Sequence, residues 1–344
     1  MINKRNLMGL LAGTAMAVAA GSTAMAQEVT LKMHQFLPAQ ANVPKLILDP
    51  WARRVEEASG GKIKIDHYPS MQLGGKPPHL MSQVEDGVAD IVWTVLGYTP
   101  GRFPSSEVFE LPFMMTNGED TSRAMWQFAE ANMMDTEFAN IKVLAVWVHG
   151  PGLIHSKAPI KSVKDLNGVK LRAPSRMTNK LFTELGATAV GMPVPAVPEA
   201  LSKGVIDATV IPWEVTGALK VPELVENHTE FGDDSLYTVG FALAMNKQKW
   251  DSLSDEMKAA MDSVSGEELS ALAGKLMQGA DAGSREAAAG RGNNIMTLTS
   301  DEVQEWKDAA AGIEAGWIEE INGYGMDGQA LVDQARELIK KNSM

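Results

Sequence analysis

The chain has 344 residues, no cysteine, and 43 acidic against 31 basic residues, which gives a net charge of −12. Without cysteine it has no disulfide, no thiolate metal site, no thiol nucleophile and no cysteine to carry a lipid anchor. We expect no nucleic-acid partner, because proteins that bind nucleic acids present basic surfaces. The length is ample for a large core and favours two lobes over one.

The first 26 residues have the pattern of an export signal. Lys4 and Arg5 form a basic start, residues 7–20 are apolar but short for a membrane span, and Ala24-Met25-Ala26 is a small-residue cleavage site. We expect cleavage after Ala26, which leaves 318 of the 344 residues with 29 basic and 43 acidic side chains. No later segment is apolar enough to cross a bilayer, so we expect a soluble protein of a bacterial periplasm.

Hydrophobic periodicity predicts two similar series of elements on either side of a break at residues 149–152. The first series has strands at 29–34, 62–68, 89–94 and 141–148, and helices at 43–58, 80–84 and 120–132. The second has strands at 152–156, 169–171, 189–193, 205–211 and 237–245, and helices at 175–185 and 197–203. A helix opens at 246–250, a helical run covers 254–290, a strand follows at 294–298, and helices fill the rest. The βαβ order predicts parallel sheets with right-handed crossovers, and therefore two α/β lobes.

One stretch combines a strand end, a cation and a helix start. Residues 165–168 form a turn, residues 169–171 a short strand, and Arg172 follows it just before the helix that opens at Ser175. A guanidinium can hold a carboxylate through two parallel hydrogen bonds, and a helix start adds free N–H groups nearby. On these residues alone, an ordinary ion pair at the surface or at an interface explains Arg172 as well as a ligand-binding role does.

Five phrases in this order are similar to a known family. They are GVADI (87–91), RFPSSEVFELPF (102–113), KDLNGVKLRAPS (164–175), EALSKGVIDA (199–208) and AMNKQKW (244–250). Together they resemble the DctP-like solute-binding proteins of TRAP (tripartite ATP-independent periplasmic) transporters, and the resemblance extends from the signal to the C-terminal helices.

The resemblance implies a two-lobed, class II-like periplasmic binding fold whose lobes are joined by hinge strands and by one long helix, which would be the run 254–290. It implies that the cleft captures an organic acid, that Arg172 grips its carboxylate, and that closure presents it to a sodium-coupled membrane permease. We expect lobe 1 to comprise residues 27–149 and about 240–293, and lobe 2 residues 150–239 and about 294–344. We expect a monomer without a cofactor.

Further candidates for the ligand site follow other strands, where parallel sheets place their ligand contacts. They are His34, Gln35, Phe36, Trp93, Thr94, Tyr98, His149, Met192, Trp213 and Glu214. Each has a structural alternative: Trp213 and Trp93 could be packing residues, and His149 could be structural. Glu214 could bind a ligand hydroxyl, hold a bridging cation, steady Arg172, or be a surface acid. We otherwise expect no metal site.

Some relatives, notably sialic-acid binders, carry a second arginine near residues 149–152, and this sequence has none there. One arginine accounts for one carboxylate. Because the other candidates are mostly apolar, we predict a monocarboxylate with an apolar, aromatic or branched body, or a 2-oxo or 2-hydroxy acid. A C4-dicarboxylate is the alternative.

Two other classes of protein compete with this interpretation. A secreted hydrolase would need His149 or His155 beside a serine such as Ser156 or Ser175, but the sequence has neither a G-x-S-x-G nor an H-E-x-x-H motif. We therefore expect no enzyme. A binding protein of an ATP-driven importer would share the two-lobed architecture, but the ordered phrases and the missing anchor cysteine favour the TRAP type.

Overall fold

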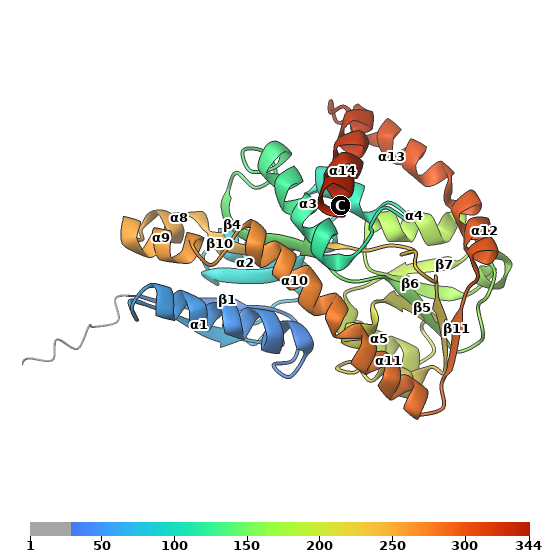
Figure 1. Ribbon diagram of the computed structural model, residues 1–344. Coiled ribbons are helices and arrows are strands. Elements are labelled where there is room, and N and C mark those ends of the chain that lie inside the picture. Colours follow the sequence, from blue (N-terminus) through green and yellow to red (C-terminus); the bar gives the residue numbers. More distant parts are fainter. Residues whose placement is uncertain (1–28) are drawn as a thin grey trace, which may run out of the picture.

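The computed structural model describes residues 29–344, so the predicted export signal lies outside the described residues. The described chain folds around two β-sheets with helices packed on both (Figure 1). The first sheet has five strands in the order β2-β1-β3-β10-β4, and the second has six in the order β11-β9-β5-β8-β6-β7. The two-lobed α/β architecture expected from the sequence is confirmed.

The strands are β1 (Val29–His34), β2 (Ile63–Tyr68), β3 (Ile91–Val95), β4 (Ile141–Val148), β5 (Leu153–Ser156), β6 (Lys170–Ala173), β7 (Thr188–Gly191), β8 (Ala208–Ile211), β9 (Asn227–Glu230), β10 (Gly240–Asn246) and β11 (Asn294–Thr297). The α-helices are α1 (Asp49–Ala58), α2 (Leu80–Glu85), α3 (Gly118–Asn132), α4 (Arg176–Glu184), α5 (Val197–Ser202), α6 (Trp213–Thr216), α7 (Val221–Leu224), α8 (Lys247–Asp251), α9 (Asp255–Asp262), α10 (Glu267–Gly279), α11 (Asp281–Gly290), α12 (Ser300–Ala310), α13 (Gly312–Gly323) and α14 (Gly328–Asn342). Shorter helical turns are η1 (Pro44–Leu48), η2 (Pro77–His79), η3 (Leu96–Tyr98), η4 (Pro104–Glu110), η5 (Val163–Leu166) and η6 (Val194–Ala196).

The first sheet begins as the βαβαβ order predicts. β1 pairs in parallel with β2 on one side and with β3 on the other. The sheet as a whole is mixed, because β10 lies antiparallel between β3 and β4. β10 returns from the second lobe and so enters this sheet in the opposite direction.

The second sheet has a parallel centre with reversed neighbours. β6 pairs in parallel with β7 and β8, whereas β5 is antiparallel to both β8 and β9. β9 was not predicted from the sequence. Its residues, NHTE, are polar, and its burial comes from pairing with β5 and β11.

Two extended segments and one helical rod join the lobes. The first segment runs from β4 to β5, and the second returns towards β10 through Tyr237, which bridges Gly152 of the first. A Cβ at Gly152 would lie 2.2 Å from the Tyr237 ring, so only glycine allows the two segments to approach this closely.

The predicted long helix over 254–290 is divided into two parts. Gly266 has φ +78°, outside the helical region, and separates α9 from α10. Ala280 joins α10 to α11 with φ −84° and ψ −8°, and the two helices continue as one rod (Figure 1). α10 packs on α3 and β4, while α11 packs on α6, so this rod extends over both sheets.

The C-terminal helices arch from the second sheet back to the first (Figure 1). α12 contacts η5 in the second lobe, whereas α14 packs on α3 and η4 beside the first sheet. The lobe boundaries stay a prediction, and the position of α14 argues for moving the last helix to the first lobe. Within residues 29–344, no helix is both long and apolar enough to span a membrane.

Candidate ligand-binding site

A cavity lies between the lobes, at the carboxyl ends of β1, β3, β6 and β8. The lining residues are Phe36, Leu37, Trp93, Val95, Tyr98, His149, Arg172, Pro174, Val194, Ile211, Pro212, Glu214, Val215, Tyr237, Val239, Phe241 and Met277. Most of these side chains are apolar. The only basic residues among them are Arg172 and His149.

Arg172 lies in β6, and its guanidinium is held by the two flanking strands. Its Nε donates to the carbonyl oxygen of Met192 just after β7, at 2.9 Å, and its Nη1 donates to the carbonyl oxygen of Val210 in β8, at 3.0 Å. The residue is 1 % exposed. These two bonds fix the position of the guanidinium before any ligand arrives.

The charge of Arg172 is not matched by a carboxylate within residues 29–344. Burial lowers the pKa of Arg172, and the interactions that partly offset this come from Tyr98 and Tyr237. A buried cation without an anion is unfavourable unless a counter-charge enters the site. The cavity is therefore complementary to an anion.

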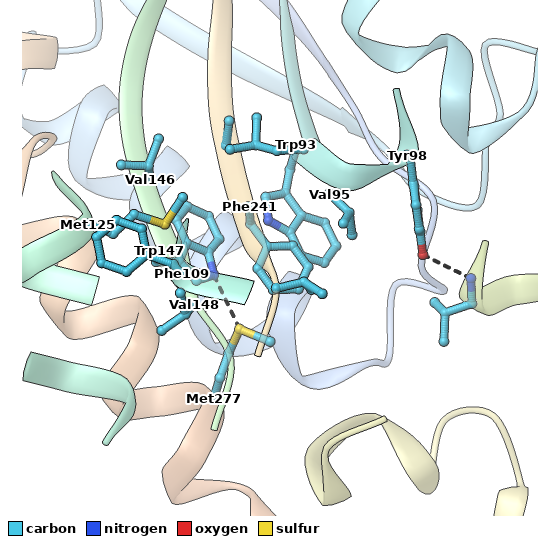
Figure 2. Packing of buried hydrophobic residues seen from close by; sticks show 14 of the residues in the cluster. Trp93, Val95, Tyr98, Phe109, Met125, Val146, Trp147, Val148, Phe241 and Met277 are labelled. Atoms are coloured by element: carbon cyan, nitrogen blue, oxygen red, sulfur yellow. Dashed lines mark hydrogen bonds between the residues drawn. The ribbon is translucent and has the colours of Figure 1, made fainter. Parts of the chain in front are cut away.

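Tyr98 adds a hydrogen-bond donor beside this cation. Its hydroxyl oxygen accepts from the backbone N–H of Val194 at 2.8 Å (Figure 2) and interacts with the Arg172 guanidinium. Burial raises the pKa of Tyr98, so the hydroxyl keeps its proton. Because the oxygen accepts from the Val194 N–H, the hydrogen of the hydroxyl is available for an anion at Arg172.

The opposite side of the cavity is a wall of nearly parallel rings, in which Trp93 stacks on Phe36 and Phe241 with centroid distances of 4.7 and 5.2 Å. The interplanar angles are 19° and 16°. Figure 2 shows Trp93 stacked with Phe241, and Trp147 supporting them with its Nε1 bonded to the Met277 sulfur at 3.2 Å. An aromatic lining of this kind suits a planar, apolar ligand body.

Glu214 is a buried acid in the same cavity. It is 3 % exposed, and burial, followed by the nearby charge of Asp281, raises its pKa to about 8. Its backbone N–H donates to Asp281 Oδ1 at 2.7 Å, and its carbonyl oxygen accepts from Asn42 Nδ2 at 2.7 Å. Its Oε2 is buried without a partner in the described chain.

His149 also lines the cavity and is neutral. Burial lowers its pKa to about 4, with the charge of Arg172 contributing in the same direction. Its Nδ1 lies 2.5 Å from the carbonyl oxygen of Gly150, which assigns the proton to Nδ1 and leaves Nε2 as an acceptor.

Side chains from both lobes meet beside the cavity. The Ser175 hydroxyl at the start of α4 donates to Glu110 Oε2 of η4 at 2.5 Å, and Arg176 pairs with Glu107 of η4 and Glu320 of α13. A Cβ at Gly97 would lie 2.6 Å from Ser175 Cβ, so glycine permits this contact between the lobes.

The structure brings six of the predicted site residues to the cavity: Phe36, Trp93, Tyr98, His149, Arg172 and Glu214. Met192 lines a neighbouring hollow, and its carbonyl group, rather than its side chain, serves Arg172. Thr94 lies between Trp93 and Val95 on β3 and points to the other face of the sheet, as strand geometry requires.

Two further predicted residues, His34 and Gln35, are also placed elsewhere. His34 bonds to Gln83 and to the N–H of Leu73, and Gln35 closes a turn onto Leu37. Their side chains are used by the first lobe itself.

Trp213 was predicted as a cavity wall, and the structure corrects this. Its ring lies 5.0 Å from the ring of His155 and 4.8 Å from that of His228, and its Nε1 donates to Glu230 at 2.8 Å. The packing alternative therefore describes Trp213, because the first turn of α6 directs its side chain towards α11 and β9.

Sequence reasoning missed Tyr237, Phe241 and Met277. The first two flank the return segment into β10, and the third comes from the helical rod. A signal existed for Phe241, since the apolar strand at 237–245 follows a lobe crossing, but nothing in the sequence placed it against Trp93.

Within residues 29–344, no group of three or more His, Cys, Asp or Glu side chains is arranged to hold a metal ion. The hydrolase alternative required a serine beside a histidine. Ser175 bonds to Glu110 and Thr178, Ser156 bonds to the Ala158 carbonyl oxygen, and His155 pairs with His228. The hydroxyl groups of both serines therefore bond to groups other than a histidine.

Comparisons with known proteins give consistent results. The family model described as bacterial extracellular solute-binding protein, family 7, matches residues 35–319. A TRAP solute-binding protein from Rhodoferax ferrireducens, solved with copurified benzoate, is 47 % identical, with 92 % of this chain and 98 % of that chain covered and a TM-score of 0.90.

Two further solved structures are similar. A marine-metagenome TRAP solute-binding protein specific for aromatic acids, solved with 3-hydroxybenzoate, is 48 % identical over 92 % of this chain and 100 % of that chain, with a TM-score of 0.90. A TRAP solute-binding protein from Bordetella bronchiseptica, solved with (R)- and (S)-mandelate, is 26 % identical over 91 % and 99 %, with a TM-score of 0.84.

Proposed function

Because the chain belongs to family 7 of the bacterial extracellular solute-binding proteins, among those of TRAP transporters, we propose that its cavity captures an aromatic monocarboxylate. The resemblance seen in the sequence is thereby confirmed, and with it a periplasmic location. Proteins of this family are transport proteins, not enzymes, and they bind small organic acids and work with membrane permease subunits. That this chain itself lacks catalytic activity, and that it is a monomer, belongs to the proposal.

The observation that carries the proposal is the environment of Arg172. Its Nε and Nη1 are bonded to backbone carbonyls, and no carboxylate in the described chain balances its charge. A ligand carboxylate would supply that charge and receive directional bonds from the guanidinium and from Tyr98. Such bonds are strong here because the site is shielded from water.

The ring wall supports an aromatic ligand body. Phe36, Trp93 and Phe241 line the cavity with aromatic rings, and a planar acid held at Arg172 can pack against them. Benzoate and 3-hydroxybenzoate are the ligands of the two relatives that are nearly half identical in sequence. Mandelate, bound by the third, is an aromatic 2-hydroxy acid. A C4-dicarboxylate is less well supported, because the lining residues offer no second arginine or lysine.

Capture follows from the contacts between lobes. A ligand that bonds to residues of both lobes favours the closed arrangement by its differential affinity for it. Here Arg172 belongs to the second sheet and Trp93 to the first, so one small acid would contact both. The closed form would then be the one presented to the permease.

Isothermal titration calorimetry against benzoate, mandelate, succinate and malate tests the proposal. We expect benzoate or mandelate to bind at least about tenfold more tightly than either dicarboxylate, because a second carboxylate would be desolvated without a cationic partner. Tight binding of succinate or malate, with no binding of the aromatic acids, would contradict it.

A further inference from the structure

Resting on the proposed function, we infer that the cavity selects aromatic acids that carry a hydroxyl group, and that Glu214 is the residue that recognises this hydroxyl. The inference starts from the buried Glu214 side chain, which the carboxylate grip at Arg172 does not use. Its Oε2 is buried without a hydrogen-bond partner in the described chain, although the residue lines the cavity.

An unpartnered buried oxygen is costly, so its presence in a ligand cavity requires a reason. Arg172 supplies donors for the acid group of the ligand, and the ring wall supplies apolar surface. Glu214 is the one acidic residue among the lining side chains. Trp93 Nε1 is the other fully buried polar atom among them that has no partner in the described chain. A hydroxyl on the ligand body is the simplest group that would bond to the free oxygen.

The backbone holds Glu214 in place independently of its side chain. Asp281 of the helical rod accepts from its N–H, and Asn42 of the first lobe donates to its carbonyl oxygen. The residue therefore lies where both lobes and the rod meet. The Asn42 amide also interacts with the carboxyl group, which leaves Oε2 as the atom without a partner in the described chain. Changing the side chain leaves the two backbone bonds intact.

The charge state of Glu214 is compatible with an anionic ligand. Burial raises its pKa to about 8, so the neutral form predominates at pH 7 and does not repel the ligand carboxylate. A hydroxyl group can donate to a carboxyl oxygen or accept from it, so it bonds to Oε2 whichever partner supplies the hydrogen. A methyl group of similar size cannot do either.

The test compares pairs of acids that differ only in this group, using calorimetry on the purified protein. The pairs are 3-hydroxybenzoate with 3-methylbenzoate and 4-hydroxybenzoate with 4-methylbenzoate, with benzoate as the common reference. We expect at least one hydroxybenzoate to bind about tenfold or more tightly than its methyl counterpart, as expected of a site that hydrogen-bonds a ligand hydroxyl.

Three variants test whether Glu214 causes the preference for hydroxybenzoates over methylbenzoates. Glu214→Leu should reduce the hydroxyl preference below about threefold, because the bond to the ligand hydroxyl is lost. Glu214→Gln keeps an oxygen and an N–H group and should retain most of the preference. Glu223→Gln, an exposed acid of α7, is the matched control and should change nothing.

Two results overturn the inference: no hydroxyl preference in the wild-type protein, or a full preference in Glu214→Leu. Tighter binding of benzene-1,3-dicarboxylate than of 3-hydroxybenzoate would also overturn it. If Glu214→Leu fails to fold, Glu214→Ala, which also removes both carboxyl oxygens, takes its place. Failure of every benzoate to bind would refute the proposed function itself, whereas benzoate binding without a hydroxyl preference refutes this inference alone.

Discussion

The two sides of the cavity are built by different means. On the second-lobe side, Arg172 is held by directional bonds to two backbone carbonyls, and few other side chains are involved. On the first-lobe side, Trp93 is held by stacking against Phe36, Phe241 and Trp147. We expect the polar side to determine that an acid binds, and the ring side to favour an acid with an aromatic body.

This difference has an energetic consequence. The ring wall is part of the hydrophobic core, so substitutions there alter both unfolding free energy and ligand affinity. Arg172 makes no ion pair in the described chain, so its substitution should alter affinity far more than stability. The predictions below test that separation.

The largest effect is expected at Arg172. Arg172→Ala should weaken benzoate binding by about 2–5 kcal/mol, because the ligand carboxylate would be buried without its cation. Arg172→Lys should also lose most of the affinity, since an ammonium cannot reproduce the guanidinium fork. Calorimetry measures both. Arg336→Ala, at an exposed pair with Glu314, is the control, and equal losses there would show that the effect is not local.

On the ring side, two substitutions of Trp93 distinguish the contribution of its ring from that of its N–H group. Trp93→Ala should lower the unfolding free energy by about 3–5 kcal/mol and abolish aromatic-acid binding, because it opens a cavity in the wall. Trp93→Phe should be much milder, since it keeps a ring and removes an N–H that has no partner in the described chain. Chemical denaturation and calorimetry on the same samples check this. A Phe variant as damaged as the Ala variant would mean that the indole N–H is essential.

Glu110 gives a pH-dependent prediction at the contact between lobes. Burial raises its pKa to about 8, above its ordinary value of 4.5. The folded state therefore binds the proton more tightly than the unfolded state, so this contribution to stability is present below pH 4.5 and is lost as the pH rises through about 8. Glu110→Gln removes that loss and keeps an acceptor for Ser175.

The measurement is thermal unfolding of wild type and Glu110→Gln at several pH values. The variant should gain about 2–4 °C in Tm at pH 8.5, the size that 1 kcal/mol produces in a large domain. The gain should vanish near pH 4.5. A gain that is equal at both pH values would show that ionisation of Glu110 is not its cause.

The smallest effect is expected from the ion pairs of Arg176. Arg176→Gln breaks the contacts with Glu107 and Glu320 beside the cleft and should weaken benzoate binding by about 1 kcal/mol or less, because the pairs are partly solvated. Raising the salt concentration should reduce the difference between variant and wild type. A loss as large as that of Arg172→Ala would place Arg176 in the site and would blur the contrast between its two sides.

The sequence predicted most of the fold because its strands and helices carry strong periodicity. It located Arg172 at a strand end, and the family resemblance implied that its partner is the carboxylate of a ligand. It could not predict β9, whose polar residues carry no strand pattern, or the break at Gly266, which depends on one positive φ angle. Sequence patterns predict single helices and strands well. They predict poorly a strand that forms only because neighbouring strands pair with it.

The same limit applies to the site. The residue order placed Trp213 after a buried strand, but its ring turns towards His155 and His228 instead of the cavity. Phe241, which joins the wall, lies far along the chain from Trp93 and reaches it only because β10 pairs with β3. Side-chain direction and long-range pairing are tertiary properties that one sequence does not encode locally.

A crystal structure of the protein with bound benzoate tests the central claim most directly. The account predicts that the carboxylate oxygens lie within about 3.2 Å of Arg172 guanidinium nitrogens, with the benzene ring against Trp93 and Phe241. A benzoate whose carboxylate bonds elsewhere, with Arg172 contacting only the carbonyl groups of Met192 and Val210, would contradict it.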